Sequence, residues 1–498
     1  MPEAGLIPSP EIVDRKIRDS ALARSRLRGI RLPTFAQLAG ETPMPEGTSE
    51  RLASVDPDSP DAANLSRVHW FNAADRRGRV EVPAHIILPK ALTGVEAPIV
   101  VMLGSPFPMI GAHKVLPAYA GLVTRLVTGT FDPDHHRAVW PSTGNYCRGG
   151  VAISRILGCD GIAVLPEGMS RERYEWLERW VADPSHIIRT YGTESNVKEI
   201  YDKCHELAAS EENVILNQFS AFSNYMAHYA CTGAAAEKIF EDYRSRNGHA
   251  RLAAFVSATG SAGTIAAGDR LKKNFGTRIA AVEALECPTM LENGYGEHNI
   301  QGIGDKHIPL IHNVMNTDVV IAVSDSFPDR LNLLFNSDAG KAYLATRDDL
   351  DPQLVAAFSE VGISGLANIV AAIKLAKRMN YGSDDVVLTV ATDSARLYTT
   401  EMESAGTKFF PDGFGSVDAD KVFDACLADI NDNNVLELDQ RERRRIFNLG
   451  YYTWVEQQGI SVEDFDRRAN QSFWQDIAAS VPAWDGMIEE FNNEAGLN

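Results

Sequence analysis

The sequence predicts an α/β fold built on parallel sheets, flanked by an N-terminal extension and a mainly helical C-terminal extension. Its 498 residues exceed the ~100–200 of an average domain. From about Val68 to about residue 400, short β-branched runs alternate with helix-like segments. This alternation is typical of parallel sheets with helices on both faces.

Six β-branched runs are the expected strands, and six intervening segments are the expected helices. The strands are Ile99–Leu103, Ile162–Leu165, Leu252–Val256, Arg278–Val282, Val319–Val323 and Val386–Val390. The helices are Val151–Leu157, Arg171–Val181, Ser195–Leu207, Tyr225–Arg244, Ile265–Asn274 and Ile369–Arg378.

Two extensions flank this pattern. Residues 1–66 are expected to be peripheral, because the stretch from Glu41 to Ser66 holds four prolines and little apolar periodicity. The stretch Ser404–Val417, with three glycines and a proline, predicts a linker into the C-terminal extension, residues 404–498. The basic run Arg441–Arg445 in that extension is interpreted as a solvated helix face.

Charge and apolar patterning argue against a nucleic-acid or membrane partner. Lys and Arg number 48 and Asp and Glu 67, so the formal net charge is −19. A protein that binds nucleic acid or an anionic membrane needs clustered positive charge on its own surface. The longest apolar runs are far shorter than the ~20 residues that cross a bilayer. Met1 to Leu22 lacks the apolar core of a secretory signal.

Cysteine and histidine spacing predicts neither disulfides nor a metal site. The six cysteines are scattered without a Cys-x-x-Cys pair, which suits a reducing cytoplasm. His135 and His136 are adjacent, and neighbouring residues do not converge on one ion. We therefore expect a cytoplasmic protein without a bound metal.

Four loops carry the candidate chemistry, because ligands in open α/β sheets bind beyond the carboxyl ends of strands. The first, Gly104–Lys114, places Lys114 at the head of an apolar helix that starts near Val115. The helix dipole makes a cation unfavourable there. Both an exposed lysine of the first turn and a functional lysine fit this local sequence.

The second and third loops offer donors to anions. Pro141–Cys147, after Ala138–Trp140, presents N–H groups and hydroxyls suited to a carboxylate, although Ser, Thr and Asn also cap helices without any ligand. Ala258–Thr264 suits a single phosphate monoester, with a mere tight turn as the alternative. It matches neither a P-loop nor the Gly-x-Gly-x-x-Gly loop of a nicotinamide dehydrogenase.

In the fourth loop, Val361–Asn368, Ser364 either caps the following helix or presents its hydroxyl to a ligand. Taken in order, the loops resemble the tryptophan-synthase-β (fold-type II) family of pyridoxal-phosphate enzymes, and most of all its cysteine synthase and cystathionine β-synthase branch. The resemblance covers about Pro98 to Tyr398. It is carried by Lys114, Ser142-Thr143-Gly144-Asn145, Asn217-Gln218-Phe219 with Asn224, His228-Tyr229 and Thr232-Gly233, Gly260-Ser261-Ala262-Gly263-Thr264, His298–Gly304 and Gly362-Ile363-Ser364.

The chain also departs from this branch. Ala-His-Lys-Val replaces the usual Ser-x-Lys-Asp-Arg around Lys114, and Tyr146 stands where cysteine synthases keep a small threonine. Ser261 and Ala262 replace the middle Thr-Gly of the phosphate-binding loop. These departures bear on the substrate rather than on the cofactor.

The resemblance implies two parallel-sheet subdomains, a catalytic core over 67–403 with a mobile smaller subdomain over about 115–225, and a homodimer. It implies pyridoxal 5′-phosphate as cofactor, bound as a Schiff base. The cofactor-binding residues would be Lys114, Asn145, Gly260, Ser261, Ala262, Gly263, Thr264 and Ser364. Lys114 and Ser364 would be catalytic. The substrate-binding residues would be Ser142, Thr143, Gly144, Asn145, Tyr146 and Gln218.

The reaction that the resemblance implies is cysteine-synthase-like β-replacement on a β-substituted L-amino acid, through an aminoacrylate intermediate. The Lys114 amine would be the base for the α-proton. The Ser364 hydroxyl, opposite the pyridine nitrogen, would favour loss of the β-substituent. β-Elimination to a 2-oxo acid and ammonia uses the same residues and stays open, as does a non-catalytic binding module.

Three neighbours of these residues have separate interpretations. Cys147 is expected to be a packed thiol rather than a nucleophile. Arg148 is interpreted as a surface arginine rather than a contact for an acidic substrate. Tyr146 would either narrow the pocket or contact a polar side chain of the substrate.

Overall fold

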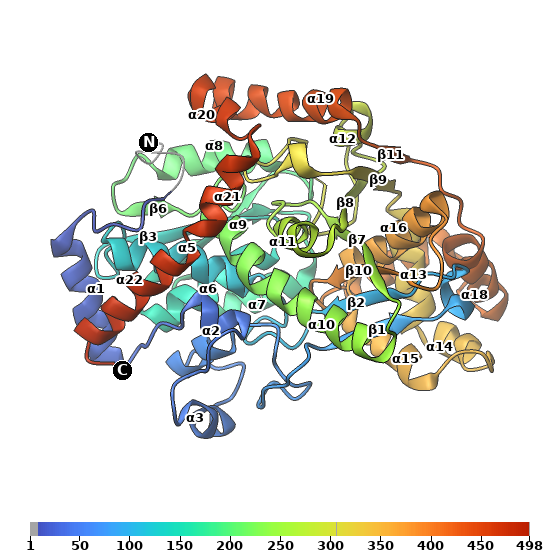
Figure 1. The fold of residues 1–498 in the computed structure, drawn as a ribbon, viewed down its shortest axis with the longest axis horizontal. Coiled ribbons are helices and arrows are strands. Elements are labelled where there is room, and N and C mark those ends of the chain that lie inside the picture. Colours follow the sequence, from blue (N-terminus) through green and yellow to red (C-terminus); the bar gives the residue numbers. More distant parts are fainter. Residues whose placement is uncertain (1–7, 305, 498) are drawn as a thin grey trace.

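The two sheets confirm the predicted α/β class. The computed structural model describes residues 8–304 and 306–497. Its larger sheet has seven strands in the order β1-β2-β10-β7-β8-β9-β11, and its smaller sheet has four in the order β5-β4-β3-β6 (Figure 1). All four strands of the smaller sheet are parallel, as are the five central strands of the larger one. The edge strands β1 and β11 pair antiparallel.

The elements have the following bounds. The strands are β1 His85–Leu88, β2 Ile99–Leu103, β3 Arg137–Pro141, β4 Asp160–Pro166, β5 Ile187–Thr190, β6 Asn213–Ile215, β7 Arg251–Ala258, β8 Arg278–Ala284, β9 Val319–Val323, β10 Asp385–Ala391 and β11 Val435–Glu437. The helices are α1 Arg15–Arg28, α2 Phe35–Ala39, α3 Thr48–Ser54, α4 Lys90–Thr93, α5 Val115–Thr128, α6 Asn145–Leu157, α7 Arg171–Trp180, α8 Val197–Leu207, α9 Phe222–Ala227, α10 Gly233–Arg246, α11 Ala266–Phe275, α12 Thr289–Glu292, α13 Ser326–Asn336, α14 Asp338–Leu344, α15 Pro352–Ala357, α16 Ile363–Met379, α17 Thr399–Phe409, α18 Ser416–Phe423, α19 Gln440–Tyr451, α20 Val462–Arg467, α21 Gln471–Ala479 and α22 Val481–Glu494. A π-helical turn, η3 His228–Thr232, joins α9 to α10.

All six predicted strands are present, as β2, β4, β7, β8, β9 and β10. The list of expected strands leaves out β3, although the run Ala138–Trp140 lies within it. The prediction also missed β1, β5, β6 and β11, which are the four edge strands of the two sheets. They are three or four residues long and only partly buried. Short, half-exposed edge strands are common because they limit pairing with the edge strands of other molecules. Such strands contain no long apolar run, so the sequence pattern did not reveal them.

Two local expectations were wrong. The stretch 404–417 is not a linker throughout, because α17 runs to Phe409 and α18 begins at Ser416. The helix expected from Val151 begins earlier, at Asn145, where the loop 142–144 turns directly into α6. The division of the chain into a core and two extensions stays a prediction.

The terminal segments cover an apolar core helix. Thirteen of the fourteen residues of α5 are buried, and a helix that is apolar on all sides must be enclosed. Helices α6 and α9 of the core cover part of α5, and α1 and α22 cover the rest. Figure 1 shows α21 and α22 crossing the molecule diagonally and ending beside α1.

A paired amide holds these terminal segments together. The Asn492 amide of α22 donates to the Leu32 carbonyl at 2.8 Å and accepts from the Leu32 N–H at 2.9 Å. Arg18 of α1 is fully buried, donates to the Val127 carbonyl at 3.0 Å and pairs with Glu494. Residues more than 450 positions apart in the chain therefore close over α5.

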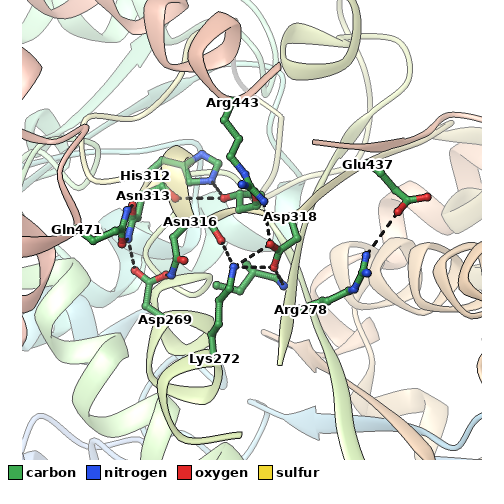
Figure 2. A network of polar contacts seen from close by, with 12 residues as sticks. Asp269, Lys272, Arg278, His312, Asn313, Asn316, Asp318, Glu437, Arg443 and Gln471 are labelled. Carbon is green, nitrogen blue, oxygen red and sulfur yellow. Dashed lines mark hydrogen bonds and ion pairs between the residues drawn. The ribbon is translucent and has the colours of Figure 1, made fainter. Parts of the chain in front are cut away.

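A polar network attaches the rest of the C-terminal segment (Figure 2). Arg443 of α19 donates to the Thr317 carbonyl at 2.7 Å and to Asp318 at 3.0 Å. Lys272 of α11 also donates to Asp318, at 2.8 Å. The basic run 441–445 is therefore not simply a solvated face. Arg441 and Arg444 are exposed, whereas the side chains of residues 443 and 445 point back onto the core.

Among residues 8–304 and 306–497, no helix combines the length and the apolar character needed to cross a bilayer.

We expect Asn492→Ala to lower the free energy of unfolding by about 3 kcal/mol, because it leaves both the N–H and the carbonyl of buried Leu32 unpaired. Asn493→Ala, at an exposed position of the same helix, is the matched control and should change stability by less than about 0.5 kcal/mol. Urea unfolding curves measure both effects. Equal stabilities of the two variants would contradict this account of the junction.

Candidate functional site

One cavity collects the predicted site residues between the two sheets. It is lined by Lys114, Ser142, Thr143, Asn145, Tyr146, Gln218, Gly260, Ser261, Ala262, Gly263, Thr264 and Ser364, together with residues such as His113, Gly302 and Thr392. Gly144 is the one predicted residue that does not line it. The loops after β2, β3, β6 and β7 supply most of the wall, as expected where parallel strands end.

Lys114 lies at the centre of the cavity. It is the N-cap of α5, and its side chain makes no capping bond. Its Nζ donates to Gln218 Oε1 at 3.0 Å and to Ser261 Oγ at 3.1 Å. The amine thus contacts the loop of the smaller sheet on one side and the loop of the larger sheet on the other.

The loop 142–145 after β3 has the geometry of an anion-binding turn. Gly144 has a φ of +148°, where an added Cβ would lie 2.7 Å from Arg173 Cδ. Ser142 Oγ accepts from the Gly144 N–H at 3.0 Å and from Gln218 Nε2 at 3.4 Å. The loop opens α6, whose N-terminus adds partial positive charge.

The loop 260–264 after β7 leads into α11. Ala262 has a left-handed φ of +60°, unusual for a residue with a Cβ. A Cβ on Gly263 would lie 2.2 Å from Asn224 Oδ1, so only glycine fits there. The backbone amides of Ser261, Ala262 and Thr264 donate no hydrogen bond to any residue in the described part of the chain.

These features fit pyridoxal 5′-phosphate. Uncommitted amides at a helix N-terminus bind a phosphate, and glycine permits its close approach. Asn224 Oδ1 is buried and lacks a hydrogen-bond partner among the described residues. Ser364, only 2 % exposed in the first turn of α16, lies on the same cavity with its Oγ 3.2 Å from Thr392 Oγ1. An amine, a phosphate loop and a hydroxyl are the groups that the resemblance requires.

A buried polar cluster joins the two sheets beside the cavity. We call Asn145, Arg173, Asp393 and Tyr398 the seam cluster. Asp393 Oδ2 accepts from Asn145 Nδ2 at 2.6 Å and from the Tyr398 hydroxyl at 2.7 Å, and that hydroxyl accepts from Arg173 Nη2 at 2.8 Å. Arg173 and Asp393 are each 1 % exposed, and burial raises the pKa of Asp393 against the opposing effect of Arg173. Asn145 is thereby held in place by residues of the larger sheet.

Arg148 is not the surface arginine that the sequence suggested. It is buried, donates to Asn145 Oδ1 at 2.8 Å and to the Ile110 carbonyl at 3.1 Å, and stacks over Trp176. Burial and neighbouring Arg173 lower its pKa to about 10. The interpretation failed because the first turn of α6 lies inside the molecule rather than on its surface.

The two neighbours of Arg148 in the chain are also buried. Cys147 donates to the Gly144 carbonyl at 2.8 Å, and burial raises the pKa of its thiol to about 12, which confirms a packed thiol. The Tyr146 ring packs edge-on against Trp140 with centroids 5.4 Å apart. Burial raises the Tyr146 pKa above its ordinary value, so its hydroxyl stays protonated at neutral pH.

Sequence reasoning missed Glu194, which bridges the two sheets beside the cavity. Thr143 Oγ1 donates to Glu194 Oε1, and the Gly302 N–H donates to the same oxygen at 2.8 Å. Burial raises the pKa of Glu194 to about 7, although Arg173 and both hydrogen bonds oppose this. No local signal marked Glu194, because it lies in an irregular segment after the missed edge strand β5. Asp393, by contrast, is the second residue after the predicted strand β10, in the kind of loop where ligands are expected.

Within the described ranges 8–304 and 306–497, no three His, Cys, Asp or Glu side chains converge in a way that could hold a metal ion.

Comparisons with known proteins agree with this geometry. A family model described as "Pyridoxal-phosphate dependent enzyme" matches residues 92–393. Cysteine synthase B of Campylobacter jejuni is 32% identical over 255 residues, which are 50% of this chain and 74% of that protein.

Two solved structures are similar in fold. A hydrogen sulfide-producing enzyme from Fusobacterium nucleatum, crystallised as a mutant with an alpha-aminoacrylate intermediate, has a TM-score of 0.53 and 23% identity, over 71% of this chain and 93% of that chain. An O-acetylserine dependent cystathionine beta-synthase from Helicobacter pylori has a TM-score of 0.50 and 22% identity, over 64% and 94%.

We expect Gly263→Ala to weaken pyridoxal 5′-phosphate binding about tenfold, ~1.4 kcal/mol, because the new methyl group displaces Asn224 from the phosphate loop. Gly248→Ala, where the added Cβ meets no atom within 4 Å, is the control. Titration of the cofactor-free protein, followed by absorbance, gives both dissociation constants. An unchanged constant for Gly263→Ala would show that the cofactor binds elsewhere.

We expect Glu194 to make substrate binding pH-dependent. As its carboxyl loses a proton around pH 7, a negative charge appears beside Thr143 and repels the substrate carboxylate. The wild-type KM should therefore rise about fivefold between about pH 6 and pH 8, and Glu194→Gln should flatten that rise.

The same titration gives an independent check on stability. The folded-state pKa of about 7 lies above the ordinary 4.5. The wild type should therefore lose stability relative to Glu194→Gln as the pH rises from 4.5 through about 7. Parallel pH profiles of the two proteins, in both KM and unfolding free energy, would contradict the raised pKa.

Proposed function

Because the chain belongs to the family of pyridoxal-phosphate dependent enzymes, we propose that it catalyses β-replacement on a β-substituted L-amino acid, in the cavity around Lys114. The observation that supports this proposal most directly is the position of Lys114 Nζ, which lies within 3.1 Å of both Gln218 Oε1 and Ser261 Oγ. Gln218 also donates to Ser142 of the loop 142–145, and Ser261 belongs to the loop 260–264, so the amine lies between the proposed carboxylate loop and the proposed phosphate loop. Both loops must face one amine for an amino acid to react on this cofactor.

The residues around Lys114 divide the work of holding the cofactor. The amides of the loop 260–264 would bind its phosphate, and the Lys114 amine would hold its aldehyde carbon as a Schiff base. Asn145, fixed by Asp393 and Arg148, would contact its ring oxygen. When bound, pyridoxal 5′-phosphate accepts the electron pair left on the amino-acid Cα.

The loops after β3 and β6, on the other side of the cavity from the loop 260–264, would bind the substrate. The backbone N–H groups of Thr143 and Asn145 and the Ser142 hydroxyl would bind the substrate carboxylate, with Gln218 beside them. This fixes the Cα–H bond toward Lys114, whose released amine takes the α-proton. Tyr146 fills volume next to the bound amino acid and limits the size of its β-substituent.

The Ser364 hydroxyl influences which bond of the amino-acid substrate breaks. Ser364 is bonded to Thr392 and faces the cavity, so it would give the pyridine nitrogen a hydrogen bond but no full counter-charge. A carboxylate there would stabilise a charged ring and a long-lived carbanion. A hydroxyl weakens that electron sink and favours departure of the β-substituent. This chemistry supports loss of the β-substituent, a step that β-replacement shares with β-elimination.

We also propose that two chains associate and that the enzyme works in the cytoplasm. None of the six cysteines forms a disulfide, which suits a reducing compartment. Sedimentation equilibrium would give the mass of the assembly, and a single-chain mass would contradict the dimer.

We expect Lys114→Ala to abolish turnover and to prevent covalent capture of the cofactor by borohydride, because no other amine among residues 8–304 and 306–497 bonds to both Gln218 and Ser261. Lys238→Ala, at an exposed position of α10, is the control and should keep both properties. Mass spectrometry of the borohydride-treated wild type should locate the cofactor on the peptide that contains Lys114. Cofactor found on another lysine would overturn the proposed site.

The products identify the reaction. With O-acetylserine as the test substrate, the wild type should form a new β-substituted amino acid when a thiol is present. If a 2-oxo acid and ammonia form at the same rate with and without the thiol, the enzyme is a β-eliminating lyase. Both products depend on Lys114.

A further inference from the structure

One carboxylate of α11 holds the helix that follows the phosphate loop. Asp269 is the fourth residue of α11, which begins just after the loop 260–264. Its Oδ2 accepts from the Tyr225 hydroxyl at 2.6 Å and from Asn313 Nδ2 at 2.8 Å, and its Oδ1 accepts from Asn316 Nδ2 at 2.7 Å. Burial raises the pKa of Asp269, and the hydrogen bonds from these three donors oppose that rise. Three side chains outside α11 therefore fix its first turn.

Asp269 is linked to the phosphate loop by a second route, through α9. Tyr225 directly follows Asn224 in α9, and Asn224 Nδ2 donates to Ser261 Oγ at 3.2 Å. A small cavity behind the loop is lined by both Ala262 and Asp269. Ala262 has a left-handed φ of +60°, and a residue strained in this way keeps its conformation only where the surrounding structure holds it. The contacts of Asp269 are thus part of what holds this loop.

The C-terminal segment reaches Asp269 through a pair of amides (Figure 2). Asn313 Nδ2 donates to Gln471 Oε1 at 3.0 Å, and Gln471 Nε2 donates to Asn313 Oδ1 at 3.0 Å. A carboxylate only accepts hydrogen bonds, so the nitrogen of the Asn313 amide must face Asp269. Both amide protons and the amide oxygen of Asn313 therefore have partners, and the amide has a single orientation.

The orientation of the Asn313 amide depends on Gln471. Asn313 is only 6 % exposed. Without Gln471, one proton and the oxygen of this buried amide would have no partner, which costs free energy. The amide would rotate to find other partners, and an amide oxygen turned toward Asp269 repels the carboxylate instead of bonding to it. Loss of Gln471 therefore weakens the bond between Asn313 and Asp269.

Gln471 is itself held in place by the helix that it begins, α21. Trp474 of α21 packs against Tyr225 and Phe222 of α9, with ring centroids 4.9 Å and 5.8 Å apart. Its indole Nε1 donates to the Arg468 carbonyl at 2.8 Å. α21 lies beyond residue 393, where the family match ends. A segment outside the matched region thus contacts both helices that flank the phosphate loop.

We propose that Gln471 is a positioning residue for the cofactor phosphate, acting through Asn313 and Asp269 on α11 and the loop 260–264. Gln471 does not line the cavity around Lys114, so it acts only through these neighbours. The C-terminal segment is then a working part of the cofactor site as well as a cover for the core. The inference rests on the proposed function, because it assumes that the phosphate binds at the loop 260–264.

A purely structural role for α21 makes a different prediction. If α21 only covers the apolar surface of α9, the polar end of Gln471 does not affect the cofactor. Gln471→Met separates the two roles, because methionine keeps the length and the apolar stem of the side chain but loses both hydrogen-bonding groups. Gln475→Met, at an exposed position of the same helix, is the matched control.

The first test measures the dissociation constant of pyridoxal 5′-phosphate in the complete protein. Gln471→Met should raise the constant about fourfold, and Gln475→Met should leave it unchanged. Asn313→Ala removes the bond to Asp269 itself and should raise the constant about tenfold. In the Asn313→Ala background, Gln471→Met should add nothing, because its route to Asp269 is already broken. Effects that multiply in the double variant would overturn this route.

The second test observes the bound phosphate directly by ³¹P NMR of the cofactor-loaded protein. In Gln471→Met, the phosphate signal should move from its wild-type position toward that of the free cofactor, because the amides of the loop 260–264 are less well aimed at it. Gln475→Met should keep the wild-type signal. Urea unfolding of the same variants without cofactor measures stability separately.

The outcomes distinguish this inference from the proposed function. A Gln471→Met variant that is less stable than the wild type but has an unchanged dissociation constant and ³¹P signal would show a purely structural role and refute the positioning role alone. A wild type that does not bind the cofactor saturably would refute the proposed site instead.

Discussion

The contact of one amine with both sheets is the constraint on which the site depends. Lys114 Nζ reaches Gln218 and Ser261 only because the carboxyl ends of the two sheets face each other across the cavity. Lys114 itself is fixed by the helix that follows it, and that helix is held on all sides by core and terminal segments. Displacing the N-terminus of α5 by one ångström would break both contacts.

Burying so many polar groups between the sheets costs free energy, and the hydrogen bonds and ion pair of the seam cluster offset that cost. An isolated buried charge is strongly unfavourable, and here each charge meets a partner from the opposite sheet. Arg173 of the smaller sheet bonds to Tyr398 and Gln301 of the larger, and Asn145 bonds to Asp393. These pairs form only when the sheets are correctly placed. The cluster therefore specifies the relative position of the two loops more than it adds stability.

The sequence revealed what local patterns encode and missed what contacts across the chain create. Central strands such as β2 and β9 are continuous apolar runs, so their limits were predicted to the residue. The six motifs around Lys114 occur in the family's order, and the structure brings them to one cavity. Arg148 looks like a surface residue in sequence, because its burial depends on Trp176 and Ile110. Glu194 could not be identified from the sequence, because its role depends on contacts with Thr143 and Gly302, which are distant in the chain.

Two departures of this chain from its branch affect the same phosphate loop and balance each other. Ala262 occupies a left-handed conformation where the branch keeps glycine, and such a conformation costs a residue with a Cβ about 1–2 kcal/mol. The loop retains that strained conformation because its neighbours hold it. Ser261 bonds to Lys114 and Asn224, and Thr264 bonds to His113. His113 is the other departure, and it supplies the bond at the far end of the loop. A loop that gave up a glycine is therefore held at both ends by side chains of the core. The same physical requirement, donors aimed at one phosphate, is met with different residues.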